Sequence, residues 1–122
     1  LAIQKATRVN DNWRLSNCTL YTTLEPCPMC MGAIQSSRIQ RVVYGTKDPR
    51  MGACGSWVDL VHDNKHPFHQ VTVTAGVCEY ECSDILKRFF RWRRKENADQ
   101  KASLKASFLN QRGLKAEDEA DY

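Results

Sequence analysis

The 122-residue sequence lacks any apolar run close to the ~18 residues that a membrane-spanning helix needs, so we expect no membrane partner. It also lacks an internal repeat, which argues against a solenoid or repeat array. No second Cys-x-x-Cys accompanies the one at Cys27 and Cys30, and this absence counts against a zinc ribbon. What remains has the length of one compact domain.

Disulfide patterning is also lacking, although the chain has six cysteines. Cys18, Cys78 and Cys82 fall in segments with an apolar pattern, where a free cysteine acts as a small hydrophobe. This placement favours a reducing compartment, and we expect a cytoplasmic protein. The net charge of +4 permits a polyanionic partner without requiring one.

Alternating helical and strand patterns predict an α/β protein with parallel strands. Helices are expected at 1–9, 28–37, 56–61 and 78–97, and strands at 18–24, 41–44 and 70–74. Beyond residue 97 the pattern decays, so residues 98–122 are predicted to form a mobile or weakly helical polar tail. The first helix begins without a capping residue, which suggests a domain truncated at its N-terminus.

Cys27 and Cys30 are the residues with the most suggestive spacing. They follow a predicted strand and begin a predicted helix, so their sulfurs should point the same way at a helix N-terminus. The partial positive charge there favours thiolate, which is the form that binds zinc. On spacing alone, a zinc site, a redox pair, half of a zinc ribbon and chance all remain open.

The neighbouring residues resemble the core of bacterial-type tRNA-specific adenosine deaminases, a family of the cytidine-deaminase-like superfamily. The resemblance covers residues 1 to about 95, and we take 1–97 as the C-terminal part of a deaminase domain. Its densest stretch is LYTTLEPCPMCMGAI at 20–34. The other matching stretches are NWRL at 12–15, RI at 38–39, RVVYG at 41–45, KDP at 47–49, Gly52, GS at 55–56, GV at 76–77, EC at 81–82 and FFRWRR at 89–94.

The resemblance implies a three-layer α/β/α fold and hydrolysis of adenosine to inosine at the tRNA wobble position. It implies zinc as the cofactor, with Cys27 and Cys30 as two thiolate ligands, and a homodimer that uses the helix after Pro28. The family's third ligand and general acid/base come from a His-Ala-Glu segment, which would precede Leu1 together with a helix and two strands. This sequence contains no His-x-Glu, so no catalytic residue is assigned within it and the isolated chain is expected to be inactive.

Asp48 and Arg50 lie in a loop bounded by glycine. Taken alone, they are most simply turn residues. In the family that it resembles, the matching loop borders the anticodon loop of tRNA. We therefore expect Asp48 to accept from a ribose 2′-hydroxyl and Arg50 to meet phosphate.

Residues 87–95 form a basic and aromatic run on a predicted helix. The plainest interpretation is an amphipathic helix with Phe89 buried and the charges solvated. The family resemblance favours contact with the anticodon stem-loop, because splayed bases stack on aromatic rings and phosphates attract arginine. The residues expected to bind RNA here are Phe90, Arg91, Arg93 and Arg94.

The chain has three histidines, and two alternative functions remain open. His62, His66 and His69 are loosely spaced, and we interpret them as surface or hydrogen-bonding side chains.

One alternative function is deamination of guanine, cytosine or a nucleoside by a member of the same superfamily. Another is a non-catalytic RNA-binding fragment. The basic and aromatic run favours RNA, because a small substrate needs no such surface.

Overall fold

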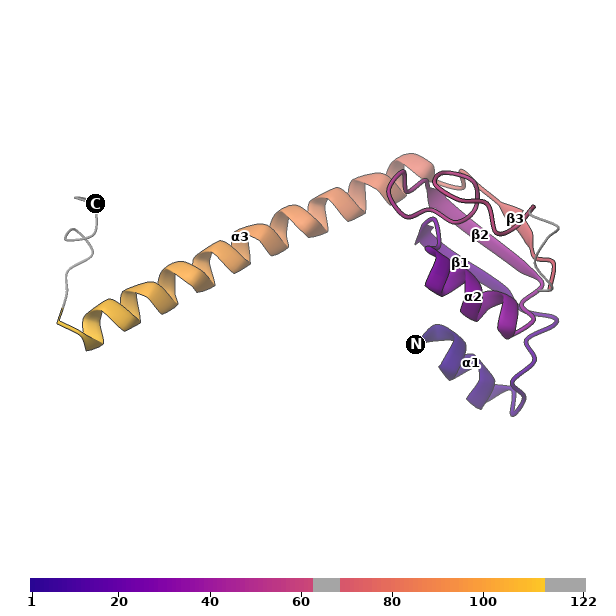
Figure 1. Cartoon of the computed structure of the whole chain (residues 1–122), viewed down its shortest axis with the longest axis horizontal. Helices are drawn as coiled ribbons and strands as arrows, with labels where there is room; N and C mark the ends of the chain where they lie inside the picture. Colours follow the sequence, from indigo (N-terminus) through magenta and orange to yellow (C-terminus); the bar gives the residue numbers. More distant parts are fainter. Residues whose placement is uncertain (63–68, 114–122) are drawn as a thin grey trace. The chain divides into compact units, whose positions relative to one another are not determined.

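The computed structural model describes residues 1–62 and 69–113 (Figure 1). Its first unit, Leu1–Ile85, holds the whole sheet, and its second unit begins at Leu86. The elements are, in chain order, α1 (Ala2–Val9), β1 (Thr19–Leu24), α2 (Pro28–Ser36), β2 (Arg41–Thr46), β3 (Thr72–Thr74) and α3 (Glu79–Gln111).

The sheet is parallel throughout, in the order β1-β2-β3. Leu20 pairs with Val42, and Val42 pairs with Val73, so one row of apolar side chains crosses all three strands. Side chains alternate along a strand, and this row therefore lies on one face. The predicted α/β class with parallel strands is confirmed.

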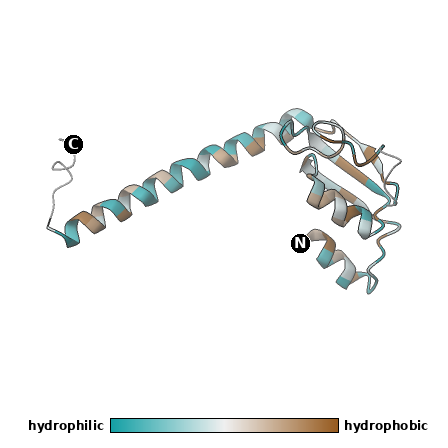
Figure 2. Cartoon of the chain, viewed as in Figure 1, coloured by the Kyte–Doolittle hydropathy of each residue, from teal (hydrophilic) through white to brown (hydrophobic). Residues whose placement is uncertain are grey.

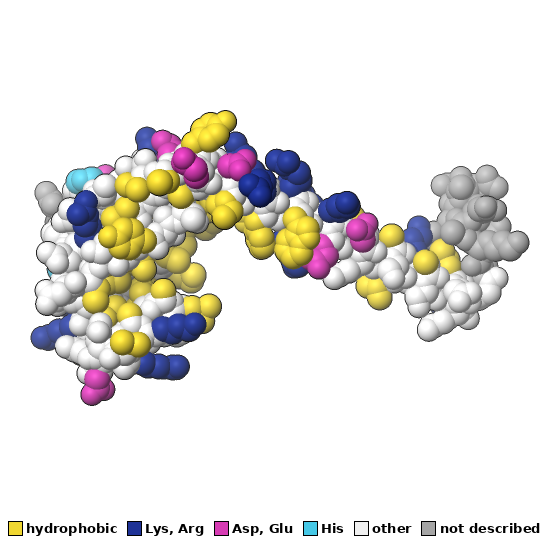
Figure 3. All heavy atoms as spheres, turned by 180° about the vertical axis from the view of Figure 1, so that it is seen from behind, with side chains coloured by type: hydrophobic (Ala, Val, Ile, Leu, Met, Phe, Trp, Pro, Cys, Tyr) yellow, Lys and Arg dark blue, Asp and Glu magenta, His cyan; other side chains and the backbone are white. Residues whose placement is uncertain are grey.

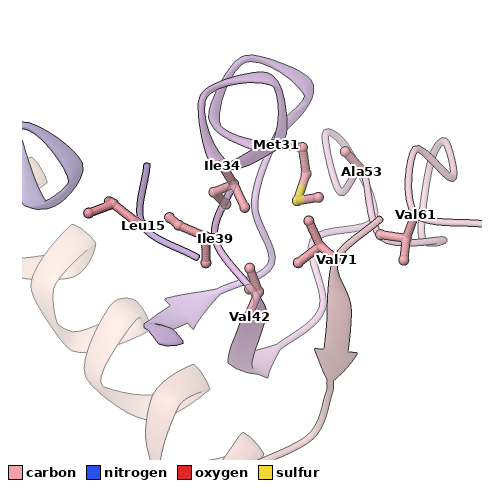
Figure 4. Packing of buried hydrophobic residues seen from close by; sticks show 8 residues of the cluster. All are labelled: Leu15, Met31, Ile34, Ile39, Val42, Ala53, Val61 and Val71. Atoms are coloured by element: carbon pink, nitrogen blue, oxygen red, sulfur yellow. The ribbon is translucent and has the colours of Figure 1, made fainter. Parts of the chain in front are cut away.

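The main core lies between that face and α2. Met31 and Ile34 are buried to 0% and 1% exposure, and they point from α2 toward Val42 (Figure 4). Ile3 and Ala6 of α1 pack against the same cluster, so α1 and α2 cover one face of the sheet. The buried cluster consists of Leu15, Met31, Ile34, Ile39, Val42, Ala53, Val61 and Val71.

The opposite face meets the first turns of α3. The strand predicted at 41–44 was expected to end before Gly45. In the structure, β2 includes Gly45 and extends to Thr46. A Cβ at Gly45 would collide with the side chain of Cys82, so only glycine permits this approach. Helices thus contact both faces of the sheet within the first unit. This agrees with the predicted three-layer α/β/α arrangement.

The helix predicted at 56–61 is absent. The segment instead turns back on itself, with an antiparallel bridge between Cys54 and Asp59 and a hydrogen bond from the Gly55 N–H to the Val58 carbonyl, 3.0 Å. Ser56 does not cap a helix, because its N–H and hydroxyl both donate to the Glu25 carboxylate. A long-range partner therefore overrides the local capping signal.

Helix α3 is longer than predicted. It passes Asn97, where its end was expected, and continues to Gln111. The segment 98–111 has lost its apolar period but keeps strong helix formers such as alanine, lysine and leucine, and it contains neither glycine nor proline. Gly113, with φ of +67°, ends it. Figure 2 shows hydrophilic residues predominating along α3. Predicted tail residues from 114 onward lie outside the described residues.

The expected burial of Phe89 is also wrong. Its side chain is 49% exposed, and its ring lies 5.4 Å from that of Phe90 and 6.0 Å from that of Trp92. The aromatic residues of the run contact one another along the helix surface. Within the described residues, no helix is both long and apolar enough to cross a membrane.

Two methionines on α2 give a matched test of the core. We expect Met31→Ala to lower the free energy of unfolding by about 2–5 kcal/mol, because it leaves a cavity against Val42. Met29 is 80% exposed, so Met29→Ala should change stability by less than about 0.5 kcal/mol. Urea unfolding of both variants measures the difference. Equal stabilities would contradict the packing of α2 on the sheet.

Candidate functional site

Cys27 and Cys30 lie at the junction of β1 and α2. Cys27 is the N-cap residue of α2, and Pro28 occupies the first helical position, where its missing N–H costs nothing. Both thiols are free; Cys30 is exposed and Cys27 is partly buried. The predicted placement of the pair, at a strand's carboxyl end and a helix N-terminus, matches the structure.

The two thiols have different electrostatic surroundings. The backbone N–H of Cys30 is the largest influence that lowers the pKa of Cys27, and the Cys30 thiol and the N–H of Met29 act in the same direction. Burial and the adjacent Cys27 thiol raise the pKa of Cys30. The helix start therefore favours a thiolate at Cys27, and a thiolate is what a metal ion binds.

A buried carboxylate lies immediately before this pair. Glu25 is 2% exposed, and its Oε2 accepts hydrogen bonds from the N–H groups of Cys54, at 3.1 Å, and Ser56, at 3.4 Å. Its Oε1 accepts from the Ser56 hydroxyl. The sequence interpretation did not single out Glu25. The available signal was a charged residue between an apolar strand and a proline.

Glu25 also influences two groups that face it. Burial first, and then the Glu25 carboxylate, raise the pKa of Tyr44 to about 12. Burial and the same carboxylate raise the pKa of Cys54 to about 12. Both groups therefore stay protonated at neutral pH, whereas the pKa of Cys27 is lowered.

The Asp48 carboxylate closes its own turn. Its Oδ1 accepts from the N–H groups of Arg50, at 3.0 Å, and Met51, at 3.3 Å. This is the turn chemistry that the sequence also allowed. The Arg50 side chain is exposed. Asp48 and Arg50 follow β2, so they lie at the same edge of the sheet as the cysteine pair, which follows β1.

An open groove of about 560 Å³ runs along this edge of the sheet. It begins where β2 and β3 end, at the carboxyl ends at which open parallel sheets bind ligands. Its lining residues are Tyr44, Lys47, Pro49, Cys54, Gly55, Ser56 and Ala75.

The remaining predicted RNA-binding residues lie on α3 in the second unit. Phe90 is 52% exposed. Arg93 donates to Glu96, at 2.8 Å, whereas Arg91 and Arg94 have no side-chain partner within the described residues. Basic, acidic and apolar side chains are intermixed along the first half of the helix (Figure 3). These residues belong to the second unit, whereas the cysteine turn belongs to the first.

The described histidines do not complete a metal site with the cysteine pair. His69 was expected at the surface or in a hydrogen bond, but its Nε2 is buried and has no hydrogen-bond partner within the described residues. His62 Nδ1 lies 2.9 Å from Asp59 Oδ2, in an exposed pair. His66 falls outside the described residues. Within 1–62 and 69–113, no group of three His, Cys, Asp or Glu side chains is arranged to hold a metal ion. The cysteine pair thus fits two positions of a tetrahedral thiolate site and leaves the others unassigned.

Comparison with known proteins identifies the family. The model of the MafB19-like deaminases matches residues 1–94, and the chain belongs to this family. A tRNA-specific adenosine deaminase of Bacillus subtilis is 42% identical over 104 residues, which is 85% of this chain and 64% of that protein. Its counterpart from Haemophilus influenzae is 46% identical over 106 residues, covering 87% and 61%. The chain thus spans about three-fifths of the length of these relatives.

A solved structure has the same fold. It comes from a study of A-to-I editing by tRNA:A34 deaminases at the wobble position, and it matches with a TM-score of 0.60 and 39% identity. The match covers 68% of this chain and 59% of the solved one. The resemblance and the cytidine-deaminase-like fold that the sequence indicated are therefore confirmed. The roles of individual site residues stay predictions.

The metal-binding role of the cysteine pair can be tested directly. We expect Cys27→Ser and Cys30→Ser each to lower the affinity of the reduced protein for Co²⁺ by more than about tenfold, because each removes a thiolate ligand. The thiolate-to-cobalt absorption band measures it, and Cys78→Ser, at another exposed thiol, is the control. A Cys27–Cys30 disulfide in protein isolated under reducing conditions would contradict the assignment.

Proposed function

We propose that this chain is part of a zinc-dependent enzyme that deaminates adenosine 34 of tRNA to inosine. The observation that carries the proposal is the Pro-Cys-x-x-Cys turn, which presents two free thiols at the start of α2. The names of the relatives support the substrate, since proteins 42% and 46% identical to the chain are tRNA-specific adenosine deaminases.

In the proposed site, Cys27 and Cys30 would hold the zinc ion. Bound zinc would supply a water molecule of lowered pKa as the nucleophile. The N–H groups that face the Cys27 sulfur stabilise its thiolate form and so prepare it as a ligand. The third protein ligand and the general acid/base would come from residues outside this chain, because the sequence contains no His-x-Glu.

The RNA would be bound by two surfaces of the chain. Asp48 and Arg50 flank the edge that carries the cysteine turn. Asp48 Oδ1 already holds its turn, which leaves Oδ2 as the oxygen for a ribose hydroxyl. On α3, Phe90 would stack on a base, and Arg91, Arg93 and Arg94 would meet phosphates. Arg93 would have to share its guanidinium with Glu96.

A homodimer and a cytoplasmic location complete the proposal. Met29 is 80% exposed on α2, and it offers apolar surface for a contact between two copies through this helix. All six cysteines are free, which suits a reducing compartment.

The activity itself is tested with RNA substrates. The enzyme that contains this chain should form inosine in an anticodon stem-loop with adenosine at the wobble position. It should leave free guanine, cytosine and cytidine unchanged. The isolated 122-residue chain should form none, because general acid/base catalysis alone typically supplies ~10²–10⁴-fold and a metal ligand is missing too. Robust deamination of a free base, or inosine formed by the isolated chain, would refute the proposal.

The RNA surface on α3 has matched controls on the same helix. Phe90→Ala should weaken stem-loop binding about tenfold, since stacking contributes ~1–3 kcal/mol per base. Phe108→Ala removes an equally exposed ring, 53% against 52%, beyond the family match and should have no effect. Arg94→Gln should reduce the salt slope of binding by roughly 0.7–0.9, and Lys101→Gln should not.

Asp48→Asn gives a separate test of sugar recognition by the same enzyme. It keeps an oxygen acceptor and gains a donor, so we expect the preference for RNA over matched DNA to fall more than RNA affinity. Competition binding with the two stem-loops measures the ratio. An unchanged ratio, with unchanged salt slopes in the α3 variants, would mean that these residues only face solvent.

A further inference from the structure

The Glu25 carboxylate is buried without a cationic partner. No ion pair within the described residues includes it, although the side chain is only 2% exposed. A buried charge is costly unless hydrogen bonds replace its hydration. The groups that bind it are neutral: two backbone N–H groups, the Ser56 hydroxyl and the Tyr44 hydroxyl. The arrangement of these donors therefore depends on the carboxylate.

The carboxylate joins two segments that are far apart in the sequence. Glu25 lies two residues before Cys27, and its side-chain partners, Cys54 and Ser56, belong to the loop after β2. Backbone hydrogen bonds run alongside it. The Glu25 N–H donates to the Thr46 carbonyl, and the Ala53 N–H donates to the Pro26 carbonyl, both at 2.9 Å.

A close approach at Gly52 extends this connection to Asp48. A Cβ at Gly52 would collide with the Glu25 carboxylate and with the Asp48 carbonyl. The Gly52 N–H donates to that same carbonyl at 2.9 Å. The contacts therefore run without a break from the cysteine turn, through Glu25 and Gly52, to the turn of Asp48.

We propose that Glu25 is a positioning residue that fixes the Cys27–Cys30 turn and the Asp48 loop in one arrangement, so that metal binding and RNA binding depend on one buried side chain. This inference rests on the proposed function for the roles of the two segments. Hydrogen bonds behind the ligands commonly set the geometry and affinity of a metal site. Glu25 connects both segments, and its side-chain hydrogen bonds go to Cys54 and Ser56 rather than to Cys27 or Cys30.

Two substitutions break the connection in different ways. Glu25→Ala removes the carboxylate and leaves the N–H groups of Cys54 and Ser56 without this acceptor. Gly52→Ala keeps the carboxylate but displaces it. Gly32→Ala is the matched control, because a Cβ there meets no atom within 4 Å.

Two milder substitutions keep the test informative if a variant fails to fold. Glu25→Gln keeps one acceptor for the N–H groups, and its amide can donate to the Ser56 hydroxyl oxygen. It should restore most of the connection. Ser56→Ala removes a single donor and should weaken the connection partly.

The first measurement is amide hydrogen exchange of the reduced, metal-free chain, followed residue by residue by NMR. For Glu25→Ala and Gly52→Ala we expect exchange about tenfold faster or more at three places. The first place is the pair of N–H groups that the carboxylate binds, those of Cys54 and Ser56. The second is the Asp48 turn, with the N–H groups of Arg50 and Met51. The third is the N–H of Met31 in the cysteine turn. Gly32→Ala should leave all three unchanged, and Glu25→Gln should resemble wild type.

The second measurement is Co²⁺ affinity, which should fall about 10–100-fold in the two disruptive variants and little in Glu25→Gln. Faster exchange at Cys54 and Ser56 alone, with the other two places unchanged, would overturn the positioning role. So would a Glu25→Gln variant as impaired as Glu25→Ala. Hydrogen exchange needs neither metal nor RNA. If the wild-type enzyme that contains this chain binds neither zinc nor tRNA, the proposed function fails, and this inference is still judged on exchange.

Discussion

The parallel pairing of β1 with β2 is the constraint on which the rest of the described structure depends. Parallel neighbours require the chain to cross back over the sheet, and α2 makes that crossing. The crossing brings Met31 and Ile34 onto Val42 and builds the main core. The same pairing makes β1 and β2 end at one edge, so Cys27 and Asp48 share that edge. Core and candidate site thus follow from a single register.

The buried Glu25 carboxylate at this edge of the sheet helps to give two cysteines different pKa values. Cys54 is held as a neutral thiol, because burial and Glu25 raise its pKa to about 12. Cys27 faces N–H groups at the start of α2, which lower its pKa. The thiolate form is therefore favoured at Cys27 and disfavoured at Cys54. The difference between the two thiols comes from burial and the Glu25 charge at Cys54, and from backbone N–H groups at Cys27.

The sequence predicted the elements whose signals are local or periodic. The strand before Glu25, the helix after Cys27 and the apolar row through Val42 all follow from patterns within a few residues. It failed at Ser56 and Gly45, where a partner far along the chain decides the structure. Glu25 was not among the predicted site residues, because its role depends on hydrogen-bond donors about thirty residues away in the sequence. The end of α3 was missed because the apolar period stops near Asn97 while helix propensity continues to Gln111.

The composition of α3 also bears on what the helix can do. A helix with little buried surface is stabilised by propensity and by pairs one turn apart, as between Arg93 and Glu96. Such a pair holds a cation near a surface that a polyanion could use. The pair also lowers the net binding free energy of a phosphate contact with that arginine, because the ion pair must first be broken. Arg91 and Arg94 have no such partner within the described residues, so they can meet phosphate without that loss. Under the proposed function, a phosphate contact would therefore contribute less binding free energy at Arg93 than at Arg91 or Arg94.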